Sequence, residues 1–241
     1  MKAMIFAAGL GTRLTPLTDT TPKALVKIKD QTLLEILINR LINAGFNQII
    51  INVHHFADQV ITYLGKKKYF GIRIEISDET DLLLDTGGGL IKAQWFFDTD
   101  EPFLLHNVDV ISDIDLIKMR DFHLNQRSFA TLAVMRRNSS RYLLVDSSNL
   151  LCGWVNTKTG EKKIARKTEL LTEFAFSGIQ WVNPDIFPLI IEEGRFSIID
   201  LYLRLAETNK ISVYDHSNTN WLDVGSLENL DEASSRFLHN N

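Results

Sequence analysis

The sequence has little that would serve a membrane, a disulfide framework or a nucleic acid. Its one cysteine, Cys152, excludes an internal disulfide and a cysteine-rich zinc cluster, and we interpret it as a small packed residue. No apolar run approaches the ~18–20 residues that span a bilayer. The formal net charge of −4 provides no general basic field for nucleic acid or anionic lipid. We therefore expect neither a nucleic-acid nor a membrane partner.

The start of the chain lacks the pattern of a secretory leader. Residues 1–9 carry one lysine and a short apolar run, but two glycines and Arg13 follow at once, so we interpret the segment as a first strand. No repeat of fixed period is present. We expect the protein to be cytoplasmic.

Short apolar runs alternate with amphipathic segments along the chain. Thr32 and Glu35 form a capping box that predicts a helix start, and Gly45 predicts its end. Glycines 87–89 are expected to precede a helical stretch through Trp95, and the polar, basic residues 158–167 are expected to form a mobile loop. The predicted strands are 2–7, 48–53, 72–76, 103–106, 129–135, 142–146, 150–155, 174–182 and 211–214, and further helices are predicted at 57–64, 116–125, 198–208 and 227–237.

Strands that alternate with helices of this length indicate crossover units and a parallel sheet covered on both faces. The possible hairpin at 142–155 adds antiparallel strands in the second half. We therefore predict an α/β fold: a three-layer α/β/α sandwich with a mixed, mostly parallel central sheet.

A glycine-rich loop, AAGLGTR at residues 7–13, follows the first predicted strand. It is not the dinucleotide fingerprint, because Leu14 stands where the third glycine would be, and no Gly-Lys-Ser/Thr follows as in a Walker A loop. Glycines let backbone N–H groups approach a phosphate or a base, and Arg13 adds a planar, permanent charge. By itself, the loop is equally compatible with a simple tight turn.

A second segment, TPKAL at residues 21–25, places Lys23 as a point charge for a phosphate. Together, A-A-G-x-G-T-R-L-x-P-L-T and T-P-K-x-L resemble the signature of the sugar-nucleotide pyrophosphorylases, a family of sugar-1-phosphate nucleotidyltransferases. The resemblance implies a Rossmann-like nucleotide-diphospho-sugar transferase fold and catalytic roles for Arg13 and Lys23. It also implies nucleotide contacts from Ala7, Ala8, Gly9, Gly11 and Thr12.

The segment DTGGGL at residues 85–90 resembles the family's L-E-T-G-G-G stretch, with Asp85 in place of the usual glutamate. In the family this stretch borders the nucleobase and ribose, so the resemblance assigns nucleotide contacts to Asp85 and Gly88. Physically, glycines at a helix start leave backbone groups open to a ligand, and a helix N-terminus favours anions. A flexible helix entry that binds nothing is the alternative.

Two aspartates stand in matching motifs far apart in the chain. Asp109, in NVD, ends a predicted strand, where a carboxylate faces the crevice of an open α/β sheet. The family pattern is N-G-D, so Val108 is a departure that crowds the sugar side. Asp223 lies in WLDVGS, which resembles W-x-D-V-G-T/S, and Ser226 is expected to cap the last helix. The resemblance implies that Asp109 and Asp223 hold Mg²⁺, a hard ion suited to carboxylates, phosphates and water.

The segment EFAFSGI at residues 173–179 resembles the family's F-S-G-I strand, which approaches the sugar ring. The resemblance assigns sugar contacts to Glu173, Ser177 and Gly178, together with Asn107 from the preceding motif. Gly178 is also compatible with a strand irregularity. We expect one domain over 1–241, with a nucleotide-binding part at 1–112, a sugar-binding part at 113–241 and a variable insert near 139–172.

The resemblance implies that a sugar 1-phosphate reacts with a nucleoside triphosphate to give an NDP-sugar and pyrophosphate. The acceptor already carries an anionic oxygen, so alignment and charge neutralisation suffice. The compact length and motif order favour UTP and N-acetylmuramate 1-phosphate, as in bacterial cell-wall recycling. Mannose or glucose 1-phosphate with GTP or another NTP is the alternative. We expect a monomer or a homodimer.

Two other classes fit parts of the sequence. A catalytically silent, nucleotide-sensing homologue would keep the fold and lose the metal pair or the Arg/Lys pair, and Val108 favours it. A metal-dependent glycosyltransferase would carry D-x-D, which residues 113–115 match, but TPKAL has no role in that case. We otherwise interpret Asp113 and Asp115 as turn and helix-cap residues.

Overall fold

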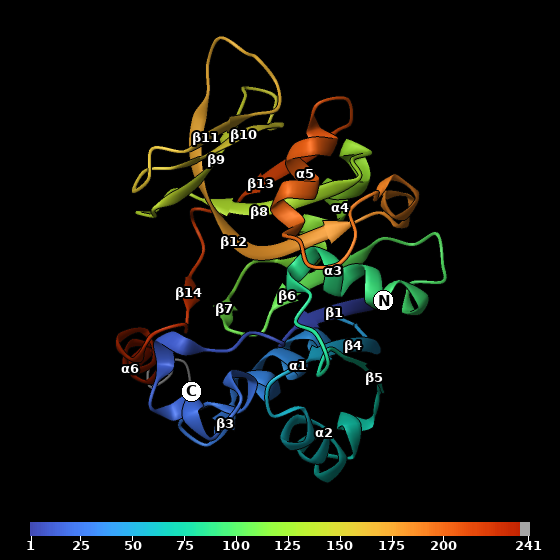
Figure 1. The fold of residues 1–241 in the computed structure, drawn as a ribbon, viewed down its shortest axis with the longest axis vertical. Helices are drawn as coiled ribbons and strands as arrows, with labels where there is room; N and C mark the ends of the chain where they lie inside the picture. Colours follow the sequence, from blue (N-terminus) through green and yellow to red (C-terminus); the bar gives the residue numbers. More distant parts are fainter. Residues whose placement is uncertain (237–241) are drawn as a thin grey trace.

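The computed structural model describes residues 1–236, and Figure 1 shows a sheet running through the molecule with helices on both sides. Within these residues, ten strands form the main sheet, in the order β11-β10-β9-β12-β6-β1-β4-β5, with β8 on β12 and β13 on β8. Its strands are β1 (Lys2–Phe6), β4 (Gln48–Val53), β5 (Arg73–Asp78), β6 (Phe103–Asn107), β8 (Ala130–Met135), β9 (Arg141–Val145), β10 (Leu151–Asn156), β11 (Lys162–Ile164), β12 (Thr172–Val182) and β13 (Ile211–Asp215).

Two small ribbons and six α-helices complete the fold. The ribbons pair β2 (Lys27–Ile28) with β3 (Gln31–Thr32), and β7 (Val110–Ser112) with β14 (Trp221–Asp223). The helices are α1 (Leu33–Asn43), α2 (Ala57–Lys66), α3 (Asp85–Lys92), α4 (Leu116–Gln126), α5 (Ile198–Ala206) and α6 (Leu227–Arg236).

The strands β5, β4, β1 and β6 run parallel, so their carboxyl ends meet at one edge of the sheet. At that edge, Phe6 of β1 stands in register with Asn52 of β4 and Asn107 of β6. Strand β12 runs antiparallel to β6 and β8, and its first residues pair with β9. The predicted fold class, a mixed sheet with parallel central strands, is confirmed.

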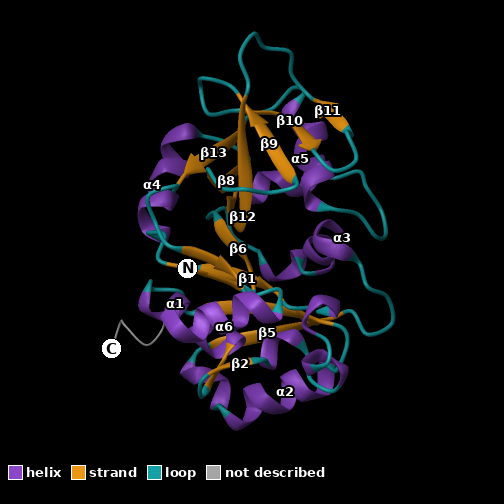
Figure 2. Cartoon of the chain, turned by 90° about the vertical axis from the view of Figure 1, so that its left-hand side faces the viewer, coloured by secondary structure: helices purple, strands orange, loops and turns teal. Residues whose placement is uncertain are grey.

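The two faces of the sheet are covered by different helices. Successive strand residues point to opposite faces, so Met4 and Phe6 belong to the core under α3 and α5, whereas Ala3 and Ile5 belong to the core under α1, α2 and α4. Figure 2 shows these helices on either side of the strands. Each fully buried aliphatic side chain of these cores contributes about 1.5–3 kcal/mol. The predicted three-layer sandwich is therefore present.

Helix α1 shows how local sequence sets an element. The Thr32 hydroxyl accepts a hydrogen bond from the Glu35 N–H at 3.1 Å, and Gly45 follows the helix end with a φ of +88°. The Glu35 carboxylate accepts hydrogen bonds from the Tyr63 hydroxyl at 2.5 Å and from Lys67 at 2.7 Å. Thus the predicted start and end of the helix are confirmed. The acidic side chain of the capping box, Glu35, links α1 to α2 and the residue after it through hydrogen bonds.

Two of the predicted elements are corrected. The glycines 87–89 lie inside α3, which begins at Asp85 and ends at Lys92, and a separate 3₁₀ turn covers Gln94–Phe96. The segment 158–167 contains β11, which pairs with β10. The polar composition that predicted a loop there suits an exposed edge strand equally well, because charged side chains protect open sheet edges. The predicted end of the last helix, Phe237, lies outside the described residues.

The link between α2 and β5 is a left-handed turn. Four consecutive residues have positive φ: 50° at Lys68, 50° at Tyr69, 53° at Phe70 and 72° at Gly71. For residues other than glycine, this conformation costs roughly 1–2 kcal/mol each. The turn therefore stores strain at the surface.

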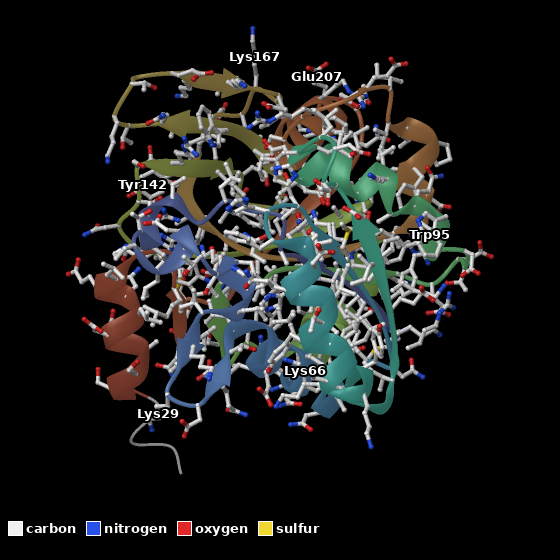
Figure 3. All side chains as sticks on the ribbon, turned by 60° about the horizontal axis from the view of Figure 1, so that its bottom comes forward. Lys29, Lys66, Trp95, Tyr142, Lys167 and Glu207 are labelled. Atoms are coloured by element: carbon white, nitrogen blue, oxygen red, sulfur yellow. The ribbon has the colours of Figure 1, made fainter. Side chains whose placement is uncertain are left out.

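Charged side chains such as Lys167 and Glu207 lie at the upper rim of the molecule in Figure 3. Trp95 is an exception at the periphery, with 56% of its surface exposed. Within residues 1–236, the helices are too short or too polar for any of them to cross a bilayer.

Candidate functional site

A cavity of about 390 Å³ opens at the carboxyl ends of β1, β4 and β6. Open α/β sheets place their ligand sites at this edge. The cavity brings together ten of the residues that we predicted for the site: Ala7, Ala8, Gly9, Gly11, Thr12, Arg13, Lys23, Asp85, Asn107 and Asp109. The same lining holds residues to which no contact had been assigned: Phe6, Asn52, Glu79, Leu83, Thr86, Val108, Arg195 and Gly225.

The glycine-rich loop is shaped by Gly11. Its φ is +66°, and a Cβ there would lie 2.9 Å from Cγ2 of Thr18. The Gly11 carbonyl accepts hydrogen bonds from the Leu14 N–H at 2.8 Å and from the Thr18 hydroxyl at 2.9 Å. Leu14 is fully buried in a small core with Val224 and Leu230. The loop is thus fixed at its far end, which leaves its first residues facing the cavity.

A buried polar pair holds the start of this loop. The Asn52 side-chain oxygen accepts hydrogen bonds from the N–H groups of Ala7 at 2.7 Å and Ala8 at 3.3 Å. The Asn52 amide donates to Glu79 at 2.8 Å, and the other Glu79 oxygen accepts from the Leu84 N–H at 3.1 Å. Burial raises the pKa of the Glu79 carboxyl. An asparagine inside the apolar run QIIINV was the signal in the sequence for this pair.

The three glycines of α3 allow neighbouring segments to pack closely against this helix. A Cβ at Gly87 would lie 2.2 Å from the Phe196 ring, and one at Gly88 would lie 2.2 Å from the Gly194 carbonyl oxygen. The Gly87 N–H also donates to the Phe196 carbonyl at 2.9 Å. Our interpretation that these glycines leave their backbone open to a ligand is therefore corrected, and Gly88 lies outside the cavity lining. The packing fixes the segment that carries Arg195 into the lining.

The two predicted metal ligands meet through the ribbon β7–β14. Asp223 stands in register with Val110, and the Val224 N–H donates to the Asp109 carbonyl at 2.8 Å. Lys23 forms an ion pair with the Asp109 carboxylate, and an Arg13 nitrogen lies 3.6 Å from the Asp223 carboxylate. Burial, and then repulsion by Asp109, raise the pKa of Asp223.

This pair of carboxylates fits a hard divalent cation. The Oδ1 atom of Asp223 is buried and has no hydrogen-bond partner within residues 1–236, which leaves an acceptor available. Over the same residues, no group of three or more His, Cys, Asp or Glu side chains is placed to hold a metal. Two carboxylates therefore require further oxygen ligands from phosphate and water, which is the usual environment of Mg²⁺.

Of the residues predicted for the sugar, Asn107 lines the cavity, whereas Ser177, Gly178 and Glu173 are outside its lining as far as the chain is described. The predicted metal ligand Asp223 is outside the lining as well. The Ser177 side chain is fully buried, with its hydroxyl 2.7 Å from Nε2 of His216. Gly178 has a φ of +74°, and a Cβ there would lie 2.8 Å from the Asn107 amide nitrogen. Glu173 is exposed. The pairing register shifts between Phe176 and Gln180, so Gly178 does lie in a strand irregularity.

The valine that replaces the family glycine is accommodated by the core. Val108 is 4% exposed and belongs to the same core cluster as Ala7 and Ile179. Its N–H donates to the Phe6 carbonyl at 3.1 Å, which extends the pairing of β1 with β6. Most of the side chain is therefore removed from the cavity.

The residues of the D-x-D string have structural roles. Asp113 accepts hydrogen bonds from the Asn220 backbone at 2.8 Å and from its side chain at 2.6 Å. Asp115 caps α4 by accepting from Ile117 at 3.1 Å and Lys118 at 3.0 Å. Ser226 caps α6, where its hydroxyl accepts from the Asn229 N–H at 3.3 Å. These contacts confirm the cap interpretations of Asp115 and Ser226, whereas Asp113 links its segment to the distant Asn220 and is not a turn residue. Because the carboxylates of the D-x-D string are engaged in this way, the support for a glycosyltransferase is removed.

Known proteins resemble this chain over most of its length. Residues 2–240 match the family described as "Nucleotidyl transferase". The chain is 32% identical to the N-acetylmuramate alpha-1-phosphate uridylyltransferase of Neisseria meningitidis over 98% of this chain and 97% of that protein. It is 29% identical to the UTP–glucose-1-phosphate uridylyltransferase of Synechocystis, over 97% of this chain and 62% of that longer protein. A mannose-1-phosphate guanyltransferase of Yarrowia lipolytica is 29% identical over 99% of this chain and 64% of its own length.

Solved structures share the fold at lower identity. HddC from Yersinia pseudotuberculosis superposes with a TM-score of 0.80 at 22% identity, covering 98% of this chain and 99% of its own. A putative glucose-1-phosphate thymidylyltransferase from Bacillus anthracis superposes with a TM-score of 0.82 at 19% identity, covering 100% and 96%. From the family match, a relative of equal length and this common fold, it follows that the chain belongs to the nucleotidyl transferase family.

Proposed function

We propose that the protein transfers a nucleotidyl group from a nucleoside triphosphate to a sugar 1-phosphate and releases pyrophosphate. One observation supports this most strongly: Arg13 of the glycine-rich loop and Lys23 of the TPKAL segment meet the carboxylates of Asp223 and Asp109 beside one cavity. Two phosphate-binding cations next to a hard-metal pair are the groups that phosphoryl chemistry needs.

The nucleoside triphosphate would occupy the cavity, with its phosphates along residues 8–13 and its base toward Glu79 and Asp85. Backbone N–H groups in a glycine-rich turn bind anionic oxygens. Because Asn52 already holds Ala7 and Ala8, little further ordering of the loop start is required when the nucleotide binds. Arg13 would then bind the pyrophosphate portion through its planar fork.

In the reaction, a bond forms between an oxygen of the acceptor phosphate and the α-phosphorus, while the bond to the bridging oxygen breaks. The electron pair of that bond leaves with pyrophosphate, so no side chain has to act as nucleophile or base. Mg²⁺ held by Asp109 and Asp223 would neutralise charge on the α-phosphate. Lys23 is oriented by Asp109 and would balance the charge of the same phosphate, and Arg13 would stabilise the leaving group.

For the substrates, we propose UTP and N-acetylmuramate 1-phosphate, in the cytoplasm and in cell-wall recycling. The relative of this activity from Neisseria meningitidis is 32% identical, with 98% of this chain and 97% of that protein covered. The glucose- and mannose-1-phosphate enzymes from Synechocystis and Yarrowia have similar identity, 29% each, and extend beyond this chain. They define the alternative substrates: glucose or mannose 1-phosphate, with UTP or GTP.

A pyrophosphate-release assay tests the proposal. Four NTPs are crossed with the 1-phosphates of N-acetylmuramate, N-acetylglucosamine, glucose and mannose in the presence of Mg²⁺. We expect the highest kcat/KM with UTP and N-acetylmuramate 1-phosphate. A preference for another pair would retain the transferase and replace the substrates. Nucleotide binding without pyrophosphate release from any pair would favour the silent homologue instead.

A further inference from the structure

Two consecutive arginines, Arg136 and Arg137, follow β8 and differ in how far their side chains are exposed. Arg136 is exposed: 66% of its side chain is accessible, and it lies 3.9 Å from the Asp215 carboxylate. Arg137 is directed inward, and its Nε atom is buried without a hydrogen-bond partner within residues 1–236. Buried donors of this kind cost about 1–3 kcal/mol when they are left unpaired, so such a group indicates a missing partner.

The Arg137 guanidinium is held in one place. Its Cζ atom lies 4.1 Å from the centre of the Trp221 ring, and one terminal nitrogen donates to the Phe176 carbonyl at 2.9 Å. Trp221 is itself fixed, because its indole N–H donates to the Ser177 carbonyl at 2.9 Å. The guanidinium therefore lies between β14 and the irregular part of β12 with its plane already oriented.

This position is on the side of Asp223 that faces β12. Trp221 and Asp223 are two residues apart on β14, so their side chains project to the same face of the strand. Arg137 stacks on Trp221 at that face. Burial lowers the pKa of Arg137, and the charge of Asp223 acts against that shift. Asp223 also has a buried oxygen without a partner, as described above. Arg137 and Asp223 thus interact through their charges, and each has a buried polar atom without a partner among the described residues, although neither lines the cavity itself.

The cations around the carboxylates come from different segments of the chain. Lys23, from the TPKAL segment, is already paired with Asp109, and Arg13, from the glycine-rich loop, approaches Asp223. Arg137 approaches from the β12 side, next to Ser177 and Gly178, and retains an unused donor. A guanidinium with Nε free prefers a phosphate or a carboxylate, which it binds through two parallel N–H groups.

We infer that Arg137 binds the phosphate of the sugar 1-phosphate. This inference rests on the proposed function. The acceptor phosphate has to approach the α-phosphate of the nucleotide, which places it at Asp109 and Asp223, and the nucleotide occupies the side of Arg13. The acceptor phosphate is therefore the anion that arrives from the side of Arg137. The guanidinium holds it there and orients the oxygen that attacks.

Arg137→Gln tests this assignment, with Arg136→Gln as the matched control and Arg137→Lys as the conservative variant. We expect Arg137→Gln to raise the KM of the sugar 1-phosphate at least about 10-fold and to lower its kcat/KM about 10²-fold, as for removal of one transition-state donor. The KM of the nucleotide should stay within about 2-fold, because Arg137 does not contact it. Arg137→Lys should lie between, since it keeps the charge and loses the planar fork. Arg136→Gln should behave like the unmodified protein.

Three results would overturn the inference. One is an unchanged KM for the sugar 1-phosphate in Arg137→Gln with normal folding by circular dichroism. Another is an equal rise in the KM of both substrates. The third is a loss with N-acetylmuramate 1-phosphate but none with N-acetylglucosamine 1-phosphate, because Arg137 would then bind the sugar's carboxylate. If Arg137→Gln fails to fold, the KM values of Arg137→Lys decide.

The proposed function and this inference are refuted by different results. Absence of pyrophosphate release by the unmodified protein with every acceptor would remove the reaction itself. Normal release by the unmodified protein and by Arg137→Gln alike would remove only the role of Arg137.

Discussion

The nucleotide side of the site and its sugar side differ in how many of their polar groups are paired before any ligand binds. On the nucleotide side, Asn52 and Glu79 are buried and hydrogen-bonded to each other and to the loop backbone. On the sugar side, Arg137 and Asp223 each have a buried atom without a partner among the described residues. The first side is organised by the protein alone, whereas the second keeps polar groups that the proposed substrate and metal would pair.

The largest effect should come from Asp223→Asn. Loss of one carboxylate from the pair removes charge that the cation needs, so we expect kcat/KM to fall by at least about 10³-fold in a pyrophosphate-release assay. Thermal stability should stay equal or rise, because burial and repulsion by Asp109 already raise the pKa of this carboxyl. Asp121→Asn, at an exposed position on α4, is the matched control. Near-normal turnover of Asp223→Asn in excess Mg²⁺ would refute the metal assignment.

Asn52→Ala tests whether the nucleotide side is organised as described. It leaves the Glu79 carboxyl and the Ala7 N–H buried without their partner, so we expect a loss of about 3 kcal/mol in the free energy of unfolding. The KM of the nucleotide should rise more than that of the sugar 1-phosphate. The exposed Asn43→Ala on α1 serves as the control, with both measured by urea unfolding and steady-state kinetics. Equal changes in the two KM values would show that the sides are not independent.

Acid should affect the two sides in opposite directions. Burial lowers the pKa of His216 to about 4, and the pKa of the unfolded residue is about 6.5. Between these values the unfolded chain binds a proton that the folded chain does not, so the contribution of His216 falls as the pH falls. The loss of stability amounts to about 1.5 kcal/mol between pH 6.5 and pH 5. Glu79 has the opposite effect, because burial raises its pKa in the folded state. At pH values just above the pKa of the unfolded residue, the folded chain therefore binds a proton that the unfolded chain does not, and stability rises as the pH falls.

His216→Gln isolates the sugar-side contribution, because Gln can still pair with the Ser177 hydroxyl. We expect the variant to lose less stability than the unmodified protein when urea unfolding is measured at pH 7 and again at pH 5. Parallel losses in the two proteins would show that His216 is not the group responsible.

The smallest effect concerns a segment outside both sides. Tyr69→Gly in the left-handed turn should raise the free energy of unfolding by about 0.5–1 kcal/mol, because glycine adopts positive φ without the steric cost. Lys66→Gly, at the last residue of α2, should not raise it, because Lys66 has no positive φ whose cost glycine could remove. Both variants should keep the kcat/KM of the unmodified protein. A loss of stability in Tyr69→Gly would mean that the aromatic contacts outweigh the strain.

Local signals in the sequence predicted much of the fold. Thr32 and Gly45 marked the start and end of α1, and strand β4 was predicted with its observed bounds, Gln48–Val53. Long-range packing was harder to predict. The glycines of α3 were interpreted as an open helix entry. They are required instead for close contact with Phe196 and the Gly194 carbonyl, which belong to a segment distant in the sequence. Similarly, β11 depends on the exposed edge of β10 and not on its own composition.

For the site, the motifs led to the cavity but not to everything that completes it. Arg13 and Lys23 stand in dense local motifs, and the structure places both at the cavity. Asn52 and Glu79 were missed because each is a single polar residue near an apolar strand, and their pairing depends on the register of β4 with β5. Arg137 was missed because only the stacking on Trp221 distinguishes it from its neighbour Arg136.

The ribbon β7–β14 also has a consequence for folding kinetics. It joins residues from the middle and the end of the chain, so Asp109 and Asp223 can meet only after a long loop has closed. The parallel strands β1, β4 and β5 lie much closer together in sequence and need no such closure. We therefore expect that, during refolding, far-ultraviolet circular dichroism recovers before catalytic competence does. Simultaneous recovery of the two signals would contradict this order.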